Sequence, residues 1–282
     1  MFDYAGGNAV HALSGIVAWV AAKILGPRIG CFDENGKHVE LATHNVSFMV
    51  LGTFILWLGF IPFIAGSPCY LNFQVGRMAV MTTFAGCFGG CYAIGFGRIL
   101  YKYWSVELAC IGVLAGMVGI CTSCGVCSLW NVLFINTPLS VLSYFFGIWF
   151  NKKMKVDDPL GASALHYWPG VVSMIYTGFF AEPKFVELVY GYGTRGEAGA
   201  VGIFYGGNGT QLGIQLLATF AMTLYGGFAA FLLFFSMKLA KILRVSEEDE
   251  IAGMDMTHHG GPAYTDKDVL PPIGKKVESA VA

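Results

Sequence analysis

Long apolar runs alternate with short polar breaks along most of the chain. Seven runs stand out, at about residues 5–25, 46–66, 73–96, 106–122, 127–150, 159–181 and 210–242. A bilayer core of about 30 Å needs roughly 20 apolar residues in a helix. Because lipid offers the backbone no hydrogen-bond partners, such runs form helices, and they lack the alternation typical of membrane β-strands. The pattern predicts an all-α, polytopic membrane bundle of seven transmembrane helices.

The composition fits a chain whose main solvent is lipid. Of its 282 residues 55% are hydrophobic and 12% are charged, whereas soluble domains carry about 25% charged residues. A net charge of −1 gives no reason to expect a nucleic acid partner. We therefore predict an integral membrane domain over residues 1–245, followed by a cytoplasmic tail over residues 246–282.

The basic residues divide unequally between the two sides of the membrane. If the seven runs cross in turn, one side holds eleven Lys and Arg residues and the other holds only Arg77, Lys184 and Arg195. The positive-inside rule then predicts an outside N-terminus and a cytoplasmic C-terminus. An outside N-terminus that leads at once into a span is typical of the later part of a longer design.

The eight cysteines lie mostly inside apolar runs, where cysteine usually acts as a small hydrophobe. Cys121, Cys124 and Cys127 have a spacing reminiscent of iron–sulfur ligands, but Asn131 stands where a fourth cysteine is needed. We expect no cofactor, no metal site and no catalytic residues, and hence a protein that is not an enzyme.

Two histidines, His11 and His166, lie within predicted spans. An ionisable side chain at that depth is costly and indicates function. At helical spacing each shares a face with small or weakly polar residues, which suits a bundle interior or a pore wall. A structural hydrogen bond to a neighbouring helix would also explain either histidine. Haem held by the pair would need a second feature, and zinc would need a third protein ligand.

Five motifs resemble the ammonium transporter family, in the family's order. They are DYAGGNAVHALSG (residues 3–15), HNVSFMVLGTFILWLGFIPFIAGS (44–67), VDDPLGASALHYWPG (156–170), FYGGNGTQLGIQ (204–215) and LRVSEEDEIAGMDMTHHGGPAY (243–264). The first and third carry the expected histidines, and together the motifs span nearly the whole chain.

The resemblance implies the fifth to eleventh helices of an eleven-helix ammonium transporter fold, which assembles as a trimer with one pore per subunit. It also implies a substrate, ammonium or ammonia with methylammonium as analogue, and a place in the plasma membrane. The implied site residues are the twin pore histidines His11 and His166, an aromatic gate of Phe63 and Phe60, and an outer ammonium site with Ser67 and Asp3.

The implied mechanism selects ammonium by deprotonation. A narrow apolar pore imposes a large desolvation cost on any bare cation. Ammonium can shed a proton and cross as ammonia, whereas potassium cannot. Burial disfavours a charged imidazole, so the pair is expected to be neutral at pH 7, with one acceptor and one donor nitrogen per ring.

Several positions depart from the family pattern and leave an alternative open. Pro62 and Ile64 replace family residues in the second motif, and Tyr167, Trp168 and Pro169 follow His166 where small residues are usual. Four helices of the family fold have no counterpart in this sequence. The alternative is a truncated or diverged, non-conducting homologue that acts as a regulatory subunit or pseudo-transporter, assembling with full-length subunits.

Overall fold

The computed structural model describes residues 1–39, 41, 43, 45–69, 74–191 and 200–261. The end of the predicted tail, residues 262–282, lies outside this part of the chain, as do Tyr264 of the fifth motif and His44. Within the described residues the secondary structure is helical, with one isolated β-bridge between Phe32 and His38.

The main helices fall where the apolar runs predict them. They are the π-helical turn η1 (Gly7–Ala12) with α1 (Leu13–Leu25), α2 (Val46–Gly66), α3 (Gln74–Tyr101), α4 (Val106–Ile120), α5 (Leu129–Asn131) with η2 (Val132–Asn136) and α6 (Thr137–Lys153), α7 (Ala162–Phe180) and α9 (Thr210–Leu239). Short elements are α8 (Pro183–Tyr190), η4 (Ile203–Tyr205), α10 (Glu247–Ala252) and α11 (Met254–Thr257).

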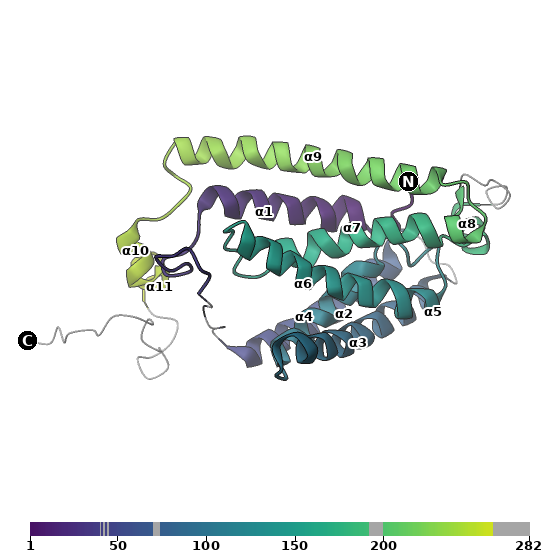
Figure 1. The fold of residues 1–282 in the computed structure, drawn as a ribbon, viewed down its shortest axis with the longest axis horizontal. Helices are drawn as coiled ribbons and strands as arrows, with labels where there is room; N and C mark the ends of the chain where they lie inside the picture. The colour runs from purple at the N-terminus through teal and green to yellow at the C-terminus, as the bar shows by residue number, and fades with distance from the viewer. Residues whose placement is uncertain (40, 42, 44, 70–73, 192–199, 262–282) are drawn as a thin grey trace, which may run out of the picture.

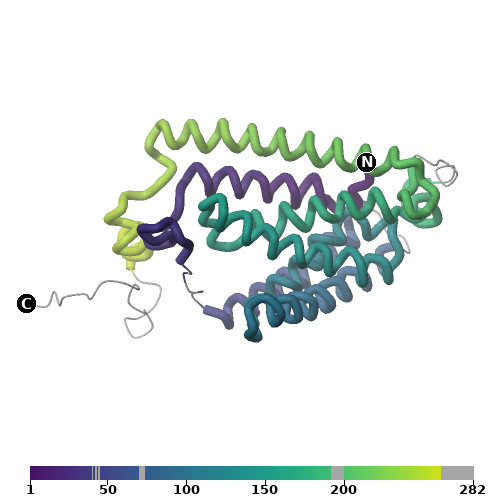
Figure 2. The backbone as a smooth tube through the Cα atoms, viewed as in Figure 1, coloured from purple at the N-terminus to yellow at the C-terminus, as the bar shows by residue number. Residues whose placement is uncertain are grey.

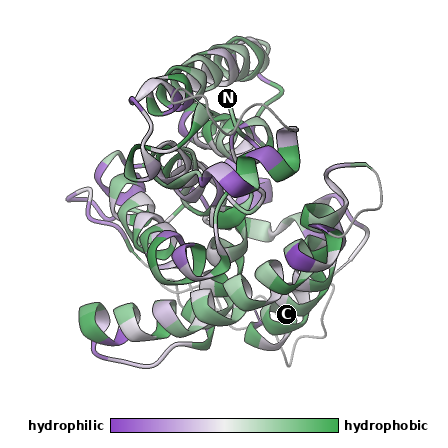
Figure 3. Cartoon of the chain, turned by 90° about the vertical axis from the view of Figure 1, so that its right-hand side faces the viewer, coloured by the Kyte–Doolittle hydropathy of each residue, from purple (hydrophilic) through white to green (hydrophobic). Residues whose placement is uncertain are grey.

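Five of these helical segments are long and apolar enough to cross a membrane among the residues described: Gly7–Leu25, Val46–Gly66, Gln74–Tyr101, Leu129–Lys153 and Thr210–Leu239. The shorter α4 is also apolar. α7 is not among the five; it carries His166, Trp168 and Pro169, which lower its hydropathy. Figure 3 shows that hydrophobic residues predominate along the helices.

The helices form two neighbouring groups. α1 packs against both α7 and α9, while α2, α3 and α4 pack against one another. α4 and α6 join the groups, since both also contact α7. Figures 1 and 2 show α9 running alongside α1 at one edge of the bundle, with α2 and α3 at the opposite edge. α1 and α7 therefore lie between the other helices.

Small residues let α3 and α4 approach closely. A Cβ added to Gly89 would lie 2.3 Å from the carbonyl oxygen of Gly112, and one added to Gly116 would lie 2.3 Å from that of Ala85. Small residues commonly occupy such interfaces because lipid provides no hydrophobic drive for helix association. Packing thus explains Gly89, Gly112 and Gly116 in these two predicted spans.

The tail folds back against the loop that follows α1. Glu250 on α10 accepts a hydrogen bond from the backbone N–H of Ile29 (2.8 Å) and pairs with Arg244 (2.7 Å). Arg244 also donates to the carbonyl of Leu25 at the end of α1. Ser246 precedes α10 as its N-cap, and its side chain accepts a hydrogen bond from the N–H of Asp249.

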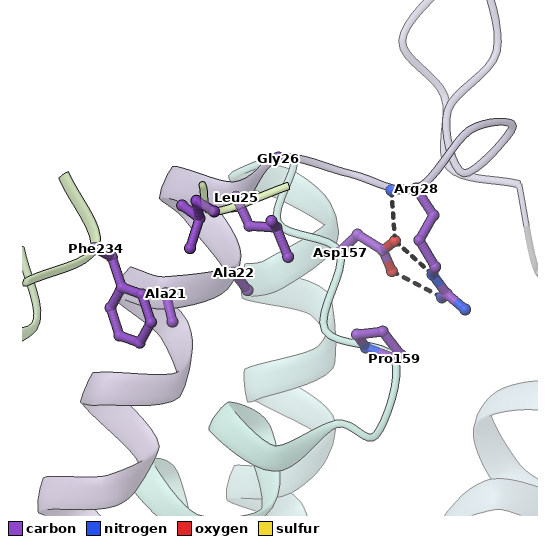
Figure 4. A pocket seen from close by; sticks show the side chains of 9 residues that line it. Ala21, Ala22, Leu25, Gly26, Arg28, Asp157, Pro159 and Phe234 are labelled. Carbon is purple, nitrogen blue, oxygen red and sulfur yellow. Dashed lines mark hydrogen bonds and ion pairs between the residues drawn. The ribbon is translucent and has the colours of Figure 1, made fainter. Parts of the chain in front are cut away.

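Arg28 connects the same loop to the start of the α6–α7 connection. Its side chain donates two hydrogen bonds to Asp157, at 2.7 and 2.9 Å, and its backbone N–H donates a third at 2.9 Å. Figure 4 shows this pair at the rim of an apolar hollow between α1 and α9, where Leu25 and Phe234 lie. Burial raises the pKa of the Asp157 carboxyl, but the hydrogen bonds from Arg28 outweigh it, and the net pKa is lowered.

Candidate functional site

The two intramembrane histidines lie against each other. The His11 and His166 rings are nearly parallel, with an angle of 7° between their planes and 5.2 Å between their centroids. His11 comes from η1 and is 5% exposed. His166 comes from α7, and its Nδ1 atom is buried without a hydrogen-bond partner among the described residues. The structure thus brings together the two residues predicted as pore histidines, and their role in transport stays a prediction.

Glycines at two contacts between the first helical segment (η1 and α1) and α7 allow the two histidines to come close together. A Cβ on Gly15 would lie 2.3 Å from the backbone nitrogen of Tyr167, so α1 and α7 touch backbone to backbone. A Cβ on Gly170 would lie 2.5 Å from the carbonyl oxygen of Gly7. His11 lies between Gly7 and Gly15 along the first helix, and His166 adjoins Tyr167. The stripe of small residues therefore brings the imidazoles into contact.

Two phenylalanines of α2 pack around His11. The Phe60 ring is 5.8 Å from the His11 ring at an angle of 12°, and the Phe63 ring is 6.0 Å away at 69°. The two phenylalanine rings also contact each other, at 5.8 Å. Phe63 remains 39% exposed, so the described residues leave the outer side of this aromatic pair open.

A cysteine completes the surroundings of His11. Cys121, which caps the end of α4, is fully buried, and its Sγ atom lies 3.3 Å from His11 Nε2. Sequence analysis treated Cys121 as a small hydrophobe and missed this contact. The two residues are 110 positions apart, and neither spacing nor composition signals that they meet.

Asp3 is occupied by protein donors. Its carboxylate accepts hydrogen bonds from the N–H groups of Asn8 and Ala9, at 3.1 and 2.9 Å, and from the Thr122 hydroxyl at 3.2 Å. Burial raises the pKa of the Asp3 carboxyl, and these hydrogen bonds offset only part of that rise. Asp3 thus holds the start of η1 to the residue after Cys121.

Ser67, the other residue predicted for an outer site, lies at the end of α2. Its hydroxyl donates to the carbonyl of Phe63 at 2.7 Å, one helical turn back. A hydroxyl keeps acceptor capacity after donating one hydrogen. Ser67 and Asp3 share no contact that the structure records, and the predicted role of each in binding ammonium stays a prediction.

The large rings that follow His166 point to neighbouring helices. Trp168 packs edge-on against Phe146 and Phe150 of α6, at 4.7 and 5.5 Å. The Tyr167 hydroxyl lies 3.3 Å from that of Thr223 on α9. α7 continues as one helix through Pro169. The departures from the family pattern at Tyr167 and Trp168 are therefore accommodated by helix packing.

No group of three or more His, Cys, Asp or Glu side chains in the described part of the chain is arranged to hold a metal ion. Fold and site together define a polytopic helical membrane protein that buries a histidine pair beside two aromatic rings.

Comparison with known proteins extends this description. A model of the Ammonium Transporter Family matches residues 1–264, and the chain belongs to that family. It is 38% identical over 277 residues to Ammonium transporter 1 member 1 of Arabidopsis thaliana, covering 93% of this chain and 54% of that protein. Ammonium transporter 1 member 1 of Solanum lycopersicum is also 38% identical, over 94% of this chain and 56% of its own length.

Solved structures show the same fold. The structure titled Sensor Amt Protein matches with a TM-score of 0.80 and 28% identity, over 91% of this chain and 60% of that chain. Candida albicans Mep2 matches with a TM-score of 0.76 and 26% identity, over 88% and 53%. The predicted fold class, a membrane helix bundle equivalent to part of an ammonium transporter, is confirmed. The chain spans about half the length of the curated relatives it matches, 54% for the Arabidopsis protein.

Proposed function

We propose that this chain contributes to transmembrane transport of ammonium or ammonia, through a hydrophobic passage in which His11 and His166 handle the substrate's proton. Family membership supports ammonium as the substrate. The observation that carries the proposal is the contact of the two imidazoles, 5.2 Å between centroids, inside a membrane bundle. A purely structural histidine needs one hydrogen-bonding neighbour, and it needs no second histidine beside it.

The surroundings of the pair suit selection by deprotonation. His11 is nearly buried and faces Phe60 and Phe63, which give an arriving cation no charged partner. Removing an ion from water into such a site is strongly unfavourable unless the ion is paired. Ammonium avoids this cost by leaving its proton behind. Each neutral imidazole then offers the ammonia molecule one donor or one acceptor.

Phe60 and Phe63 act as an aromatic gate in this proposal. Their rings meet edge to face, with planes 77° apart, and the exposed ring, Phe63, takes the outer position in this gate. A cation passing this point meets the π-faces of the rings, which attract cations by about 0.5–1 kcal/mol at exposed sites. Ser67, one turn further along α2, supplies a hydroxyl for the outer ammonium site, and Asp3 supports that side by fixing η1.

Closure of the passage requires further protein. Phe63 is 39% exposed, and large side chains along α2, such as Phe54 and Leu58, are 61% and 73% exposed. We infer that other family segments cover this face, either in one longer polypeptide or in full-length subunits, and that subunits assemble as trimers. We place the chain in the plasma membrane, with its N-terminus outside the cell and its tail in the cytoplasm.

The alternative is a non-conducting homologue that regulates full-length subunits. It is favoured by the exposure of large apolar side chains along α2, such as Phe54 and Leu58, because a passage with an open side wall cannot exclude lipid. Both functions keep the fold and the histidine pair, but only the transporter requires the pair to act on substrate.

Uptake of labelled methylammonium by cells that lack their own ammonium transporters tests the proposal. The chain is expressed alone and together with a full-length family member, with surface amounts matched. Uptake above the background of empty cells by the chain alone, or uptake in the mixture that falls when His11→Ala is introduced only into this chain, supports transport. If the chain alone gives no uptake, and uptake in the mixture does not change with His11→Ala, the result supports the non-conducting homologue.

A further inference from the structure

We propose that Cys121 is a positioning residue that fixes which nitrogen of His11 carries the proton. The Cys121 sulfur lies between two groups: His11 Nε2 at 3.3 Å and the Met117 carbonyl oxygen at 3.3 Å. Both distances are within the range of hydrogen bonds that involve sulfur. Any effect on transport rests on the function proposed above, whereas the assignment of the proton does not.

The number of available hydrogens determines which group donates in each of the two contacts. We take both contacts to be hydrogen bonds at the same time. A carbonyl oxygen can only accept, so the hydrogen bond to Met117 then uses the one hydrogen of the thiol. The sulfur then has lone pairs but no hydrogen left for His11. We therefore assign His11 Nε2 as the donor. Because a neutral imidazole has one N–H, His11 Nδ1 is left as a bare acceptor.

The backbone around Cys121 holds the thiol in this place. The N–H of Ala5 donates to the Cys121 carbonyl at 2.7 Å, and Thr122 donates to Asp3 at 3.2 Å. Asp3 in turn accepts from the first amides of η1, the element that carries His11. Cys121 is fully buried, so no water competes for either contact. Thiol and imidazole are thus positioned by one hydrogen-bonded unit.

A fixed tautomer of His11 determines which atom of the histidine pair can accept a proton. With Nδ1 of His11 an obligatory acceptor, that ring can take a proton but cannot donate one from the same atom. The buried Nδ1 of His166 has no protein partner among the described residues and stays available to ammonia. Loss of the thiol would let His11 exchange between tautomers, and only one of them would match the substrate.

Magnetic resonance measures the tautomer directly. The full chain is labelled with ¹⁵N-histidine and reconstituted in phosphatidylcholine bilayers at neutral pH, and the His11 signals are assigned with a His11→Gln variant. The proposal expects a single Nε2–H tautomer in wild type. Cys121→Ser, which keeps a donor and an acceptor, retains it, and Cys121→Ala gives a mixture.

Cys124→Ala is the matched control. Cys124 is also fully buried three residues along, but its sulfur donates to the Cys121 carbonyl, at 3.9 Å, and forms no hydrogen bond with His11 in the described part of the chain. It should keep the wild-type His11 signals. Helical content by circular dichroism establishes that each variant folds. A wild-type Nδ1–H tautomer, or a His11 spectrum unchanged in Cys121→Ala, overturns the proposal.

The uptake assay adds a functional reading. Cys121→Ala should lower methylammonium uptake roughly tenfold at matched surface amount, and Cys121→Ser should restore most of it. If wild type itself shows no uptake, the proposed function fails, while the tautomer spectra still decide the role of Cys121. If Cys121→Ala takes up methylammonium as wild type does, the thiol has no effect on transport and the proposed consequence is wrong.

Discussion

Gly15 lies so close to Tyr167 that a Cβ on the glycine would stand 2.3 Å from the tyrosine's backbone nitrogen. This relationship fixes the separation of the two helices that carry His11 and His166. The contact of the imidazoles, 5.2 Å between centroids, therefore depends on a residue that touches neither ring.

Gly15→Ala should push α1 and α7 apart. Overpacking in a closely packed interior costs about 1–3 kcal/mol, which exceeds the gain of about 1 kcal/mol from replacing glycine in a helix. Thermal unfolding in detergent should show the loss of stability, and methylammonium uptake should fall with it. Gly213→Ala in α9 is the control, since a Cβ there meets nothing within 4 Å. Wild-type stability and uptake in Gly15→Ala would contradict this account of the helix contact.

Glu250→Ala should loosen the tail. Glu250 joins α10 to the Ile29 backbone and to Arg244, and partly exposed ion pairs contribute up to about 1 kcal/mol. Tryptic cleavage after Arg244 should accelerate by up to about fivefold. Glu247→Ala, on the same short helix and without a recorded ion pair, should cleave at the wild-type rate. Equal rates for the two variants would show that Glu250 does not hold the tail.

Acid should release the same junction only at low pH. Burial raises the pKa of Glu250, but the Ile29 N–H and Arg244 lower it by a larger amount. The net pKa therefore lies below its ordinary 4.5. The net pKa of Asp157 also lies below its ordinary 3.8. A lowered folded-state pKa means that the stabilisation is complete above the unfolded-state pKa and is lost as pH falls through the folded-state value.

Trypsin does not cleave at acid pH, so hydrogen exchange of the Ile29 amide is the appropriate measurement. After correction for intrinsic exchange rates, its protection should be constant from neutral pH down to the ordinary Glu250 pKa of 4.5 and should be lost only as the pH falls further. Protection that declines steadily between neutral pH and pH 5 would assign the junction to a different titrating group.

The helices could be predicted closely from the sequence because apolar run length is set by bilayer thickness. The predicted span 46–66 has the same bounds as α2, and the predicted span 5–25 ends where α1 ends. The π-helical turn at Gly7–Ala12 could not be foreseen, since its hydrogen-bonding pattern depends on Asp3 and on close packing with Gly170. The pattern of apolar residues along the sequence does not predict such contacts.

The candidate site was predictable in part. Buried histidines are costly, so His11 and His166 stood out from the sequence, and the family motifs pointed to Phe60 and Phe63. Cys121 did not stand out, because a cysteine in an apolar run is usually a space-filling residue. The orientation of Trp168 was equally hidden. Its ring lies against Phe146 and Phe150, a choice made by the packing of α6 and not by local sequence.

The most direct test of the account compares saturable methylammonium uptake by wild type, His11→Ala and His166→Ala. Each is expressed at matched surface amount in transporter-deficient cells, with the full-length partner if the chain needs one. The account predicts that either substitution abolishes the saturable component while the bundle stays folded, as circular dichroism and thermal unfolding would verify. Uptake unchanged from wild type in a folded His11→Ala variant would contradict the central role of the histidine pair.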